Sequence, residues 1–272
     1  MSNEETRLTR RDFLKVAGRT GAGAAVAVAA AAGGFEVGKV RERERLGDFK
    51  IVDMAPRFDE GKGIVAPPVL PIDRFTFEAR VRLDPFGGKG PQTRYVFRQP
   101  SRDSGIDVGL FIHGGEGVGD GQTGILQAAF WDSKGPQGLS TEPVVNAGLW
   151  YHLAMVKDRG RVKLFVDGAQ VASRSYDGSS PSYGSDGLVL GSEISSNLGR
   201  SLMGEMNWVR VSDNARYGDD FSPLLPMKKL EVDEHTVALW DLQGSLRDSS
   251  GHGHDVKPVN PLMEFTVVVD AS

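Results

Sequence analysis

The chain has 272 residues, a formal net charge of −4 and a pI near 5.8, so no excess of Lys and Arg predicts binding to nucleic acid. It contains no Cys, which excludes disulfides, thiolate zinc sites, iron–sulfur clusters and covalently attached haem. Glycine contributes 35 of the 272 residues, about 13% against a usual share of about 7%, which predicts many tight turns between short strands.

Residues 1–34 have the pattern of an export signal. Arg10 and Arg11 are followed by Phe13, Leu14 and a weakly apolar run of Ala, Gly and Val. This order resembles the twin-arginine export signal, which implies transport of the folded protein to the periplasm or the exterior. The run is too short and too rich in Ala for a stable transmembrane span, so none is expected after signal removal. Both cleavage of the signal and its retention as an anchor are compatible with the pattern.

The pattern of apolar residues changes after a charged spacer of mixed sign, residues 35–49. The segment 75–83 is apolar at every odd number and polar at every even number, which predicts a half-buried antiparallel strand. Gly160 and the pair Asp167-Gly168 indicate tight turns, so residues 150–176 are expected to form a three-stranded meander. Further strands are predicted at 94–98, 106–112, 124–131, 188–191, 204–212 and 236–242.

This regular spacing of strands, without an amphipathic helix after the signal, favours an all-β sandwich or jelly roll. Three pairs of segments make the expectation more specific: 58–63 with 75–81, 150–156 with 164–172, and 188–191 with 204–211. Together they resemble the laminin G-like branch of the concanavalin A-like lectin/glucanase superfamily. The resemblance implies a two-sheet antiparallel jelly-roll sandwich, which we place at residues 50–269.

The C-terminal segment 236–269 departs from the family pattern. Its run around Trp240 and the loop from Asp248 to Asp255 look like the beginning of such a domain, but they stand at its end. Either a second module is truncated here, or the segment closes the sandwich from the far terminus. Because its apolar residues would otherwise be left in water, we expect it to pack on the sandwich. We expect residues 236–242 to pair with the first strands, near Phe58.

The superfamily includes glucanases, so catalysis needs a separate test. A retaining glycosidase requires two carboxyl groups about 5–5.5 Å apart, which a strand provides at a spacing of two or four residues. The nearest match holds Glu231, Asp233 and Glu234, in which Glu234 points to the face opposite Glu231. These residues lie in a predicted connecting loop, where solvated charge is the simpler explanation. The sequence therefore predicts a domain without catalytic activity.

Three residues are candidates for ligand binding. Trp131 follows Phe130 at the end of an apolar strand, and neighbours on a strand face opposite ways, so one of the two rings must leave the core. An exposed Trp131 could stack on a sugar ring, or it could only cover the backbone of a loop. The Gly-rich segment 114–122 could place Asp120 and Gln122 at the rim of a binding site, or it could be a plain hairpin loop.

Calcium is the one cofactor that the sequence suggests, because it takes oxygen ligands and needs neither Cys nor His. The loop that holds Asp248, Ser249 and Gly251 offers side-chain and carbonyl oxygens, and Asp59 could be brought near it. The alternative for Asp248 is an Asx turn within its own loop.

The sequence therefore predicts an exported, monomeric, non-catalytic binding module, with a glycan as the expected partner. The alternative is a structural or adhesive domain that recognises an extracytoplasmic protein, and a third reading is a glycan hydrolase of the same superfamily. Exposed aromatic side chains over a sheet would indicate a glycan site, whereas a contiguous apolar patch with a polar rim would indicate a protein site.

Overall fold

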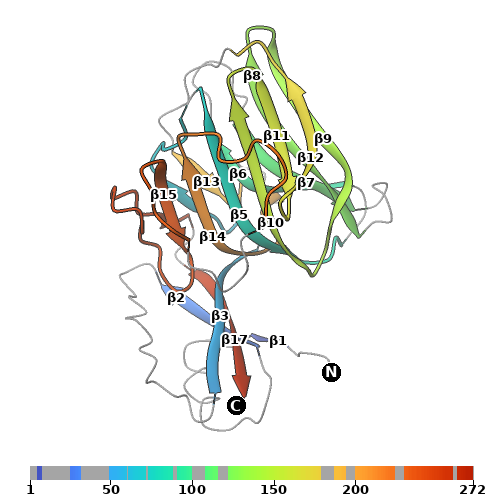
Figure 1. Cartoon of the computed structure of the whole chain (residues 1–272). Helices are drawn as coiled ribbons and strands as arrows, with labels where there is room; N and C mark the ends of the chain where they lie inside the picture. The colour runs from blue at the N-terminus through green and yellow to red at the C-terminus, as the bar shows by residue number, and fades with distance from the viewer. Residues whose placement is uncertain are drawn as a thin grey trace.

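The computed structural model describes residues 5–7, 25–31, 49–59, 61–71, 73–87, 91–99, 108–115, 122–178, 187–193, 200–223, 230–259 and 262–271. The signal residues Arg10, Arg11, Phe13 and Leu14 lie outside these ranges, as does Asp120. Every named element is a β-strand, and the strands form the two sheets of a sandwich, which confirms the predicted all-β class (Figure 1). No helix in the described ranges is long and apolar enough to cross a membrane.

The first sheet, sheet A, has ten strands, and all its pairs except β1 with β2 are antiparallel. β15 (Thr236–Asp241) pairs with β14 beside the main path of the sheet. The path runs through β1 (Glu5–Arg7), β2 (Ala25–Ala31), β17 (Leu262–Ala271), β3 (Phe49–Phe58), β14 (Gly204–Ser212), β5 (Phe75–Leu83), β10 (Trp150–Asp158), β11 (Arg161–Val166) and β12 (Ala169–Ser175).

The second sheet, sheet B, has seven antiparallel strands, and β6 to β9 follow one another as a meander. The order is β16 (Lys257–Pro258), β4 (Ile64–Ala66), β13 (Leu188–Leu190), β6 (Pro91–Gln99), β7 (Val108–Gly115), β8 (Thr123–Asp132) and β9 (Gly135–Asn146).

The core lies between the two sheets. Phe77 of β5 stacks on Phe97 of β6 with ring centroids 3.9 Å apart, and both side chains are fully buried. Each such side chain contributes about 1.5–3 kcal/mol relative to exposure. The turn between β11 and β12 has φ values of 47° at Asp167 and 81° at Gly168, which is the left-handed conformation that the sequence predicts there.

The sequence does not reveal β9. This strand contains Pro136 and Pro143 and two glycines, which read as a loop in a sequence. It stands at the end of the order of sheet B, and proline is tolerated on an edge strand because no neighbour needs its missing N–H group.

The prediction that β5 is half-buried is wrong. The polar side chains of its outer face are buried as well, with Thr76 and Glu78 fully inaccessible. The reason is a covering segment, residues 213–223, which lies over the outer face of sheet A. Its Tyr217 and Phe221 pack against Phe165 of β11, with ring centroids 6.0 and 5.4 Å from that ring.

A buried carboxylate holds the covering segment on the sheet. Glu78 accepts hydrogen bonds from Arg210 Nε at 2.7 Å, from His152 Nε2 at 2.9 Å and from the hydroxyl of Tyr217 at 2.8 Å. Burial opposes ionisation of Glu78, but the hydrogen bond from His152 and the charge of Arg210 outweigh it. The pKa of Glu78 therefore lies well below its usual range, and the carboxylate is ionised.

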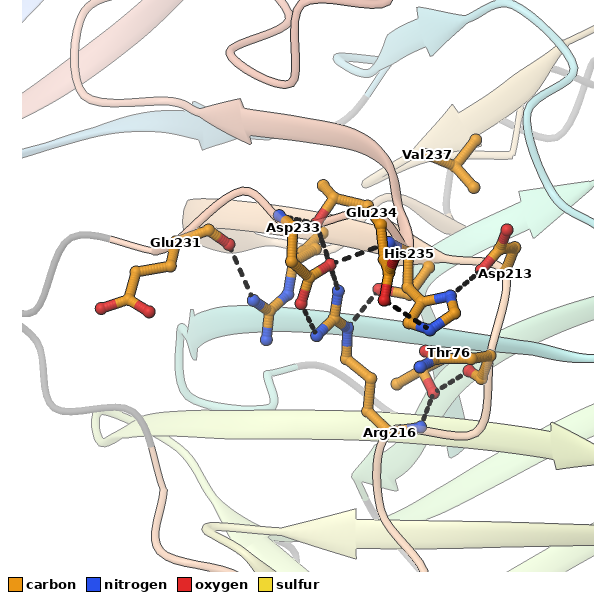
Figure 2. A network of polar contacts seen from close by, with 12 residues as sticks. Thr76, Asp213, Arg216, Glu231, Asp233, Glu234, His235 and Val237 are labelled. Atoms are coloured by element: carbon orange, nitrogen blue, oxygen red, sulfur yellow. Dashed lines mark hydrogen bonds and ion pairs between the residues drawn. The ribbon is translucent and has the colours of Figure 1, made fainter.

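A second clamp joins the covering segment to the loop before β15 (Figure 2). Arg216 makes a bidentate ion pair with Asp233, with N–O distances of 2.7 and 2.6 Å. The backbone N–H group of Arg216 donates to the hydroxyl of Thr76 on β5 at 2.9 Å. The hydrogen bond from Arg216 is the main reason that the pKa of Asp233 lies below its usual range.

The C-terminal segment packs on the sandwich but pairs with a different strand from the one expected. β15 pairs with β14, in register from Trp208↔Asp241 to Ser212↔Thr236, and not with the first strands near Phe58. Phe58 of β3 pairs with the other end of the same β14 edge, at Gly204. The two strands therefore share one edge. Trp240 is fully buried in the main core, and β17 runs beside β3 (Figure 1).

We predict that Glu78→Gln destabilises the fold by about 3–5 kcal/mol at pH 7, because it leaves Arg210 buried without its counter-charge. Tyr217→Phe, which removes one hydrogen bond to the same carboxylate, should cost about 1 kcal/mol. Urea unfolding followed by circular dichroism measures both variants. Equal stability of Glu78→Gln and the wild type would contradict the role of the carboxylate.

The same experiment has a pH dependence. Because the pKa of Glu78 is lower in the folded chain than its ordinary value of 4.5, the folded state binds fewer protons there than the unfolded state. Its contribution to stability is present above about pH 4.5 and is lost as the pH falls below that value. The difference between the wild type and Glu78→Gln should therefore shrink on acidification.

Candidate functional site

The outer face of sheet B offers partly exposed side chains on four neighbouring strands, β6 to β9. We call it the β6–β9 face. Along β8 the burial alternates strictly, with every even residue buried and every odd residue partly exposed. Phe130 is fully buried in the core, and Trp131 lies on the outer face, as the alternation predicts. Trp131 is thus the candidate that the structure places on an open surface.

One row of this face is aromatic at one end and polar at the other. Tyr95, Phe111, Gln127 and Ser140 are successive register partners on β6, β7, β8 and β9. The rings of Tyr95 and Phe111 lie with centroids 5.6 Å apart. The amide nitrogen of Gln127 donates to the hydroxyl of Ser140 at 2.9 Å.

The next row consists mainly of small residues. Arg98, Gly109, Ala129 and Gly138 are register partners across the same four strands. At about 4.8 Å per strand the row is about 14 Å long. It runs between the row of Phe111 and the position of Trp131, which pairs with Pro136. Aromatic side chains thus flank a strip where only backbone and methyl groups project.

On the other side of the aromatic row, Thr93 of β6 pairs with His113 of β7. The hydroxyl of Thr93 and Nδ1 of His113 form a hydrogen bond of 3.1 Å. This pair adds polar groups beside Phe111.

The structure separates the predicted ligand-binding residues from one another. Gln122 is exposed just before β8, and its carbonyl oxygen accepts a hydrogen bond from Ala147 N at 3.2 Å. Trp131 stands nine residues further on, at the other end of β8, which is about 30 Å away at about 3.3 Å per residue. These two residues therefore do not contribute to one compact site. Tyr95, Phe111 and Gln127 join Trp131 on the face instead.

The candidate calcium ligand Asp248 has a structural role in its loop. Its Oδ1 accepts hydrogen bonds from Leu239 N at 3.0 Å and Ser250 N at 2.9 Å, and its Oδ2 accepts them from Ser250 Oγ at 2.8 Å and His254 N at 3.0 Å. Burial alone would raise the pKa of Asp248, but these donors lower it. This geometry is the Asx turn that the sequence offers as the alternative.

Asp59, the other candidate calcium ligand, accepts from Arg57 Nε at 3.0 Å and from Lys62 Nζ at 3.1 Å. Within the described ranges, no group of three or more His, Asp or Glu side chains could hold a metal ion. Calcium binding through Asp248, Ser249, Gly251 and Asp59 stays a prediction.

The carboxylates nearest to a glycosidase pattern lie in a loop, not on a strand. Asp233 is engaged by Arg216 and also accepts a hydrogen bond from the hydroxyl of Thr236 at 2.9 Å. Glu231 is exposed, and its side chain points away from this network (Figure 2). Their arrangement is explained by the clamp on the covering segment.

The comparisons with known proteins agree with this architecture. A family model described as the concanavalin A-like lectin/glucanases superfamily matches residues 59–220. A candidate carbohydrate-binding protein from Bacteroides ovatus has a similar structure, with a TM-score of 0.54 and 17% identity. The match covers 82% of this chain and 60% of that protein, so the chain spans about three fifths of its length. A search of the curated proteins found no match.

Two further solved structures are similar at a lower level. Domains LG4-5 of the mouse laminin α1 chain match with a TM-score of 0.43 and 16% identity, over 64% of this chain and 47% of that one. The CBM40 of the Ruminococcus gnavus IT-sialidase, bound to α2,3-sialyllactose, matches with a TM-score of 0.40 and 10% identity, over 63% of this chain and 92% of that one. The family match extends over more than half of the sequence, and the chain belongs to the concanavalin A-like lectin/glucanases superfamily.

Proposed function

We propose that the chain is a non-catalytic carbohydrate-binding module whose ligand lies on the β6–β9 face. The observation that carries the proposal is the arrangement of three partly exposed aromatic side chains, Tyr95, Phe111 and Trp131, on two sides of a row of small residues. Aromatic rings offer flat apolar surfaces to the C–H faces of sugars, and Gln127 offers an amide for sugar hydroxyl groups.

The opposite surface of the sandwich supports the choice of this face. The outer face of sheet A is covered by the segment 213–223, and its Trp208 and His152 are buried. The partly exposed Trp150 of that sheet is engaged by Arg80, whose guanidinium carbon lies 4.2 Å from the ring centroid. A sugar would have to displace these contacts, whereas the β6–β9 face is open along its four strands.

A domain that recognises an extracytoplasmic protein is the alternative. Such a site usually carries a contiguous apolar patch. The large apolar side chains most exposed among the described residues are Leu149, Val232 and Val259, which stand on three separate loops. This distribution favours the glycan. The covered face of sheet A and the engagement of Asp233 by Arg216 favour binding without hydrolysis.

We predict that Phe111→Ala and Trp131→Ala each weaken glycan binding at least tenfold, or about 1.4 kcal/mol, without changing the melting temperature by more than a few degrees. A glycan array identifies the ligand, and calorimetry with and without calcium measures its affinity. Trp150→Ala is the matched control, because it removes a partly exposed Trp from the other sheet. Loss of binding in the control alone, or binding only to a protein partner, would contradict the assignment.

We also propose export through the twin-arginine pathway, on the basis of Arg10, Arg11, Phe13 and Leu14. Changing both Arg10 and Arg11 to Lys should leave the precursor in the cytoplasm, because the specificity of the signal resides in the pair and not in its weak apolar run. Cell fractionation measures the distribution. The spacer variant Arg41→Lys with Arg43→Lys serves as the control, and normal export of the signal variant would refute this route.

A further inference from the structure

Two arginines stand at one end of the β6–β9 face. Arg98 occupies the β6 position of the row of small residues, and it pairs on its other side with Val189 of β13. Glu193 follows β13, and Arg200 comes from the next described stretch of chain. We call Arg98, Glu193 and Arg200, together with the hydroxyl of Tyr95, the basic end of the face.

The two guanidinium groups share one carboxylate. Arg98 Nη1 lies 3.4 Å from Glu193 Oε1, and Arg200 Nη1 lies 3.4 Å from Glu193 Oε2. Both are the closest N–O approaches of their ion pairs, and charge-assisted hydrogen bonds of this kind are usually 2.7–2.9 Å long. The basic end thus holds two positive charges against one negative charge, and its ion pairs are loose.

The exposure of the three side chains places the positive charge outward. The side chain of Glu193 is 10% exposed, that of Arg98 is 18% exposed and that of Arg200 is 48% exposed. Burial is the main cause that raises the pKa of Tyr95, and the charge of Glu193 adds to it, so its hydroxyl remains protonated and able to donate. A ligand approaching along the row of small residues therefore meets N–H and O–H donors with a surplus positive charge.

The charge on β9 has the opposite sign. The exposed Glu142 lies on this edge strand, three strands from β6 and thus about 14 Å away. Between these ends the face presents the uncharged side chains of Phe111, Gln127 and Ala129. The polarity of the face therefore fixes where an acidic group of a bound ligand can be accommodated.

We propose that the ligand is an acidic saccharide whose carboxylate lies between Arg98 and Arg200 while its rings lie over Tyr95 and Phe111. The inference rests on the proposed function, because it assigns the chemical class of the glycan bound at the same face. Arginine suits this role because its planar guanidinium group can present two N–H donors to a carboxylate. Glu193 holds the two arginines in place and is not a contact of the ligand.

The test compares three oligosaccharides of equal length: an oligouronate, the neutral product of its carboxyl reduction, and a sulfated neutral chain. Titration calorimetry with the exported protein should give at least tenfold tighter binding of the oligouronate than of the neutral product. The preference should shrink in high salt. Arg98→Gln and Arg200→Gln should each reduce it severalfold, and Arg161→Gln, an exposed arginine on β11, should not.

The possible outcomes separate the two proposals. Equal binding of the oligouronate and its neutral product would overturn the acidic class but leave the carbohydrate-binding function intact. Tightest binding of the sulfated chain would overturn the assignment to a carboxylate. If none of the three binds while a neutral glycan of the array does, the acidic class fails, and if no glycan binds at all, both proposals fail. Because Arg200 is half exposed, its variant remains a valid test should Arg98→Gln fold poorly.

Discussion

The ionised carboxylate of Glu78 is the interaction on which the division of labour between the two sheets depends. It lies in the middle of sheet A, fully buried, and receives donors from β10, β14 and the covering segment, through His152, Arg210 and Tyr217. An isolated carboxylate would be too costly to bury, so the three donors and the covering segment depend on one another. The outer face of sheet A becomes a second, polar core, and it is closed to a ligand.

The outer face of sheet B has no comparable cover in the described chain. Its side chains are displayed in register, and two bulges decide which of them point outward. The bulge in β6 between Tyr95 and Phe97 sends both Val96 and Phe97 inward and brings Arg98 to the same face as Tyr95. Without that bulge, Arg98 would share the inward direction of Arg94. The basic end of the face thus depends on one extra residue in a strand.

These features mark the boundary of what the sequence predicts. The alternation within 75–83 and the turn at Asp167-Gly168 are local, so the positions of β5 and of the hairpin after it in the meander follow from the residues alone. The outward direction of Trp131 is equally local. The cover over β5 is not, because it arises from residues more than 130 positions away in the chain, such as Tyr217 with Glu78.

The site depends on register in the same way. Tyr95, Phe111 and Gln127 become neighbours only through the pairing of three strands, and no local pattern distinguishes them from other half-buried residues. β9 was hidden by its prolines, and Arg94 and Arg98, four residues apart, read as one face until the bulge is known. The sequence supplied the fold family and one residue of the face, and the sheet supplies the rest.

The central claim is that ligand binds to sheet B and not to sheet A. Backbone amide hydrogen exchange, measured residue by residue with and without saturating glycan, tests it most directly. Binding at the β6–β9 face should slow exchange on β6 to β9 and leave β5, β10 and β14 unchanged. Slower exchange confined to β5, β10, β14 or the covering segment would contradict the account.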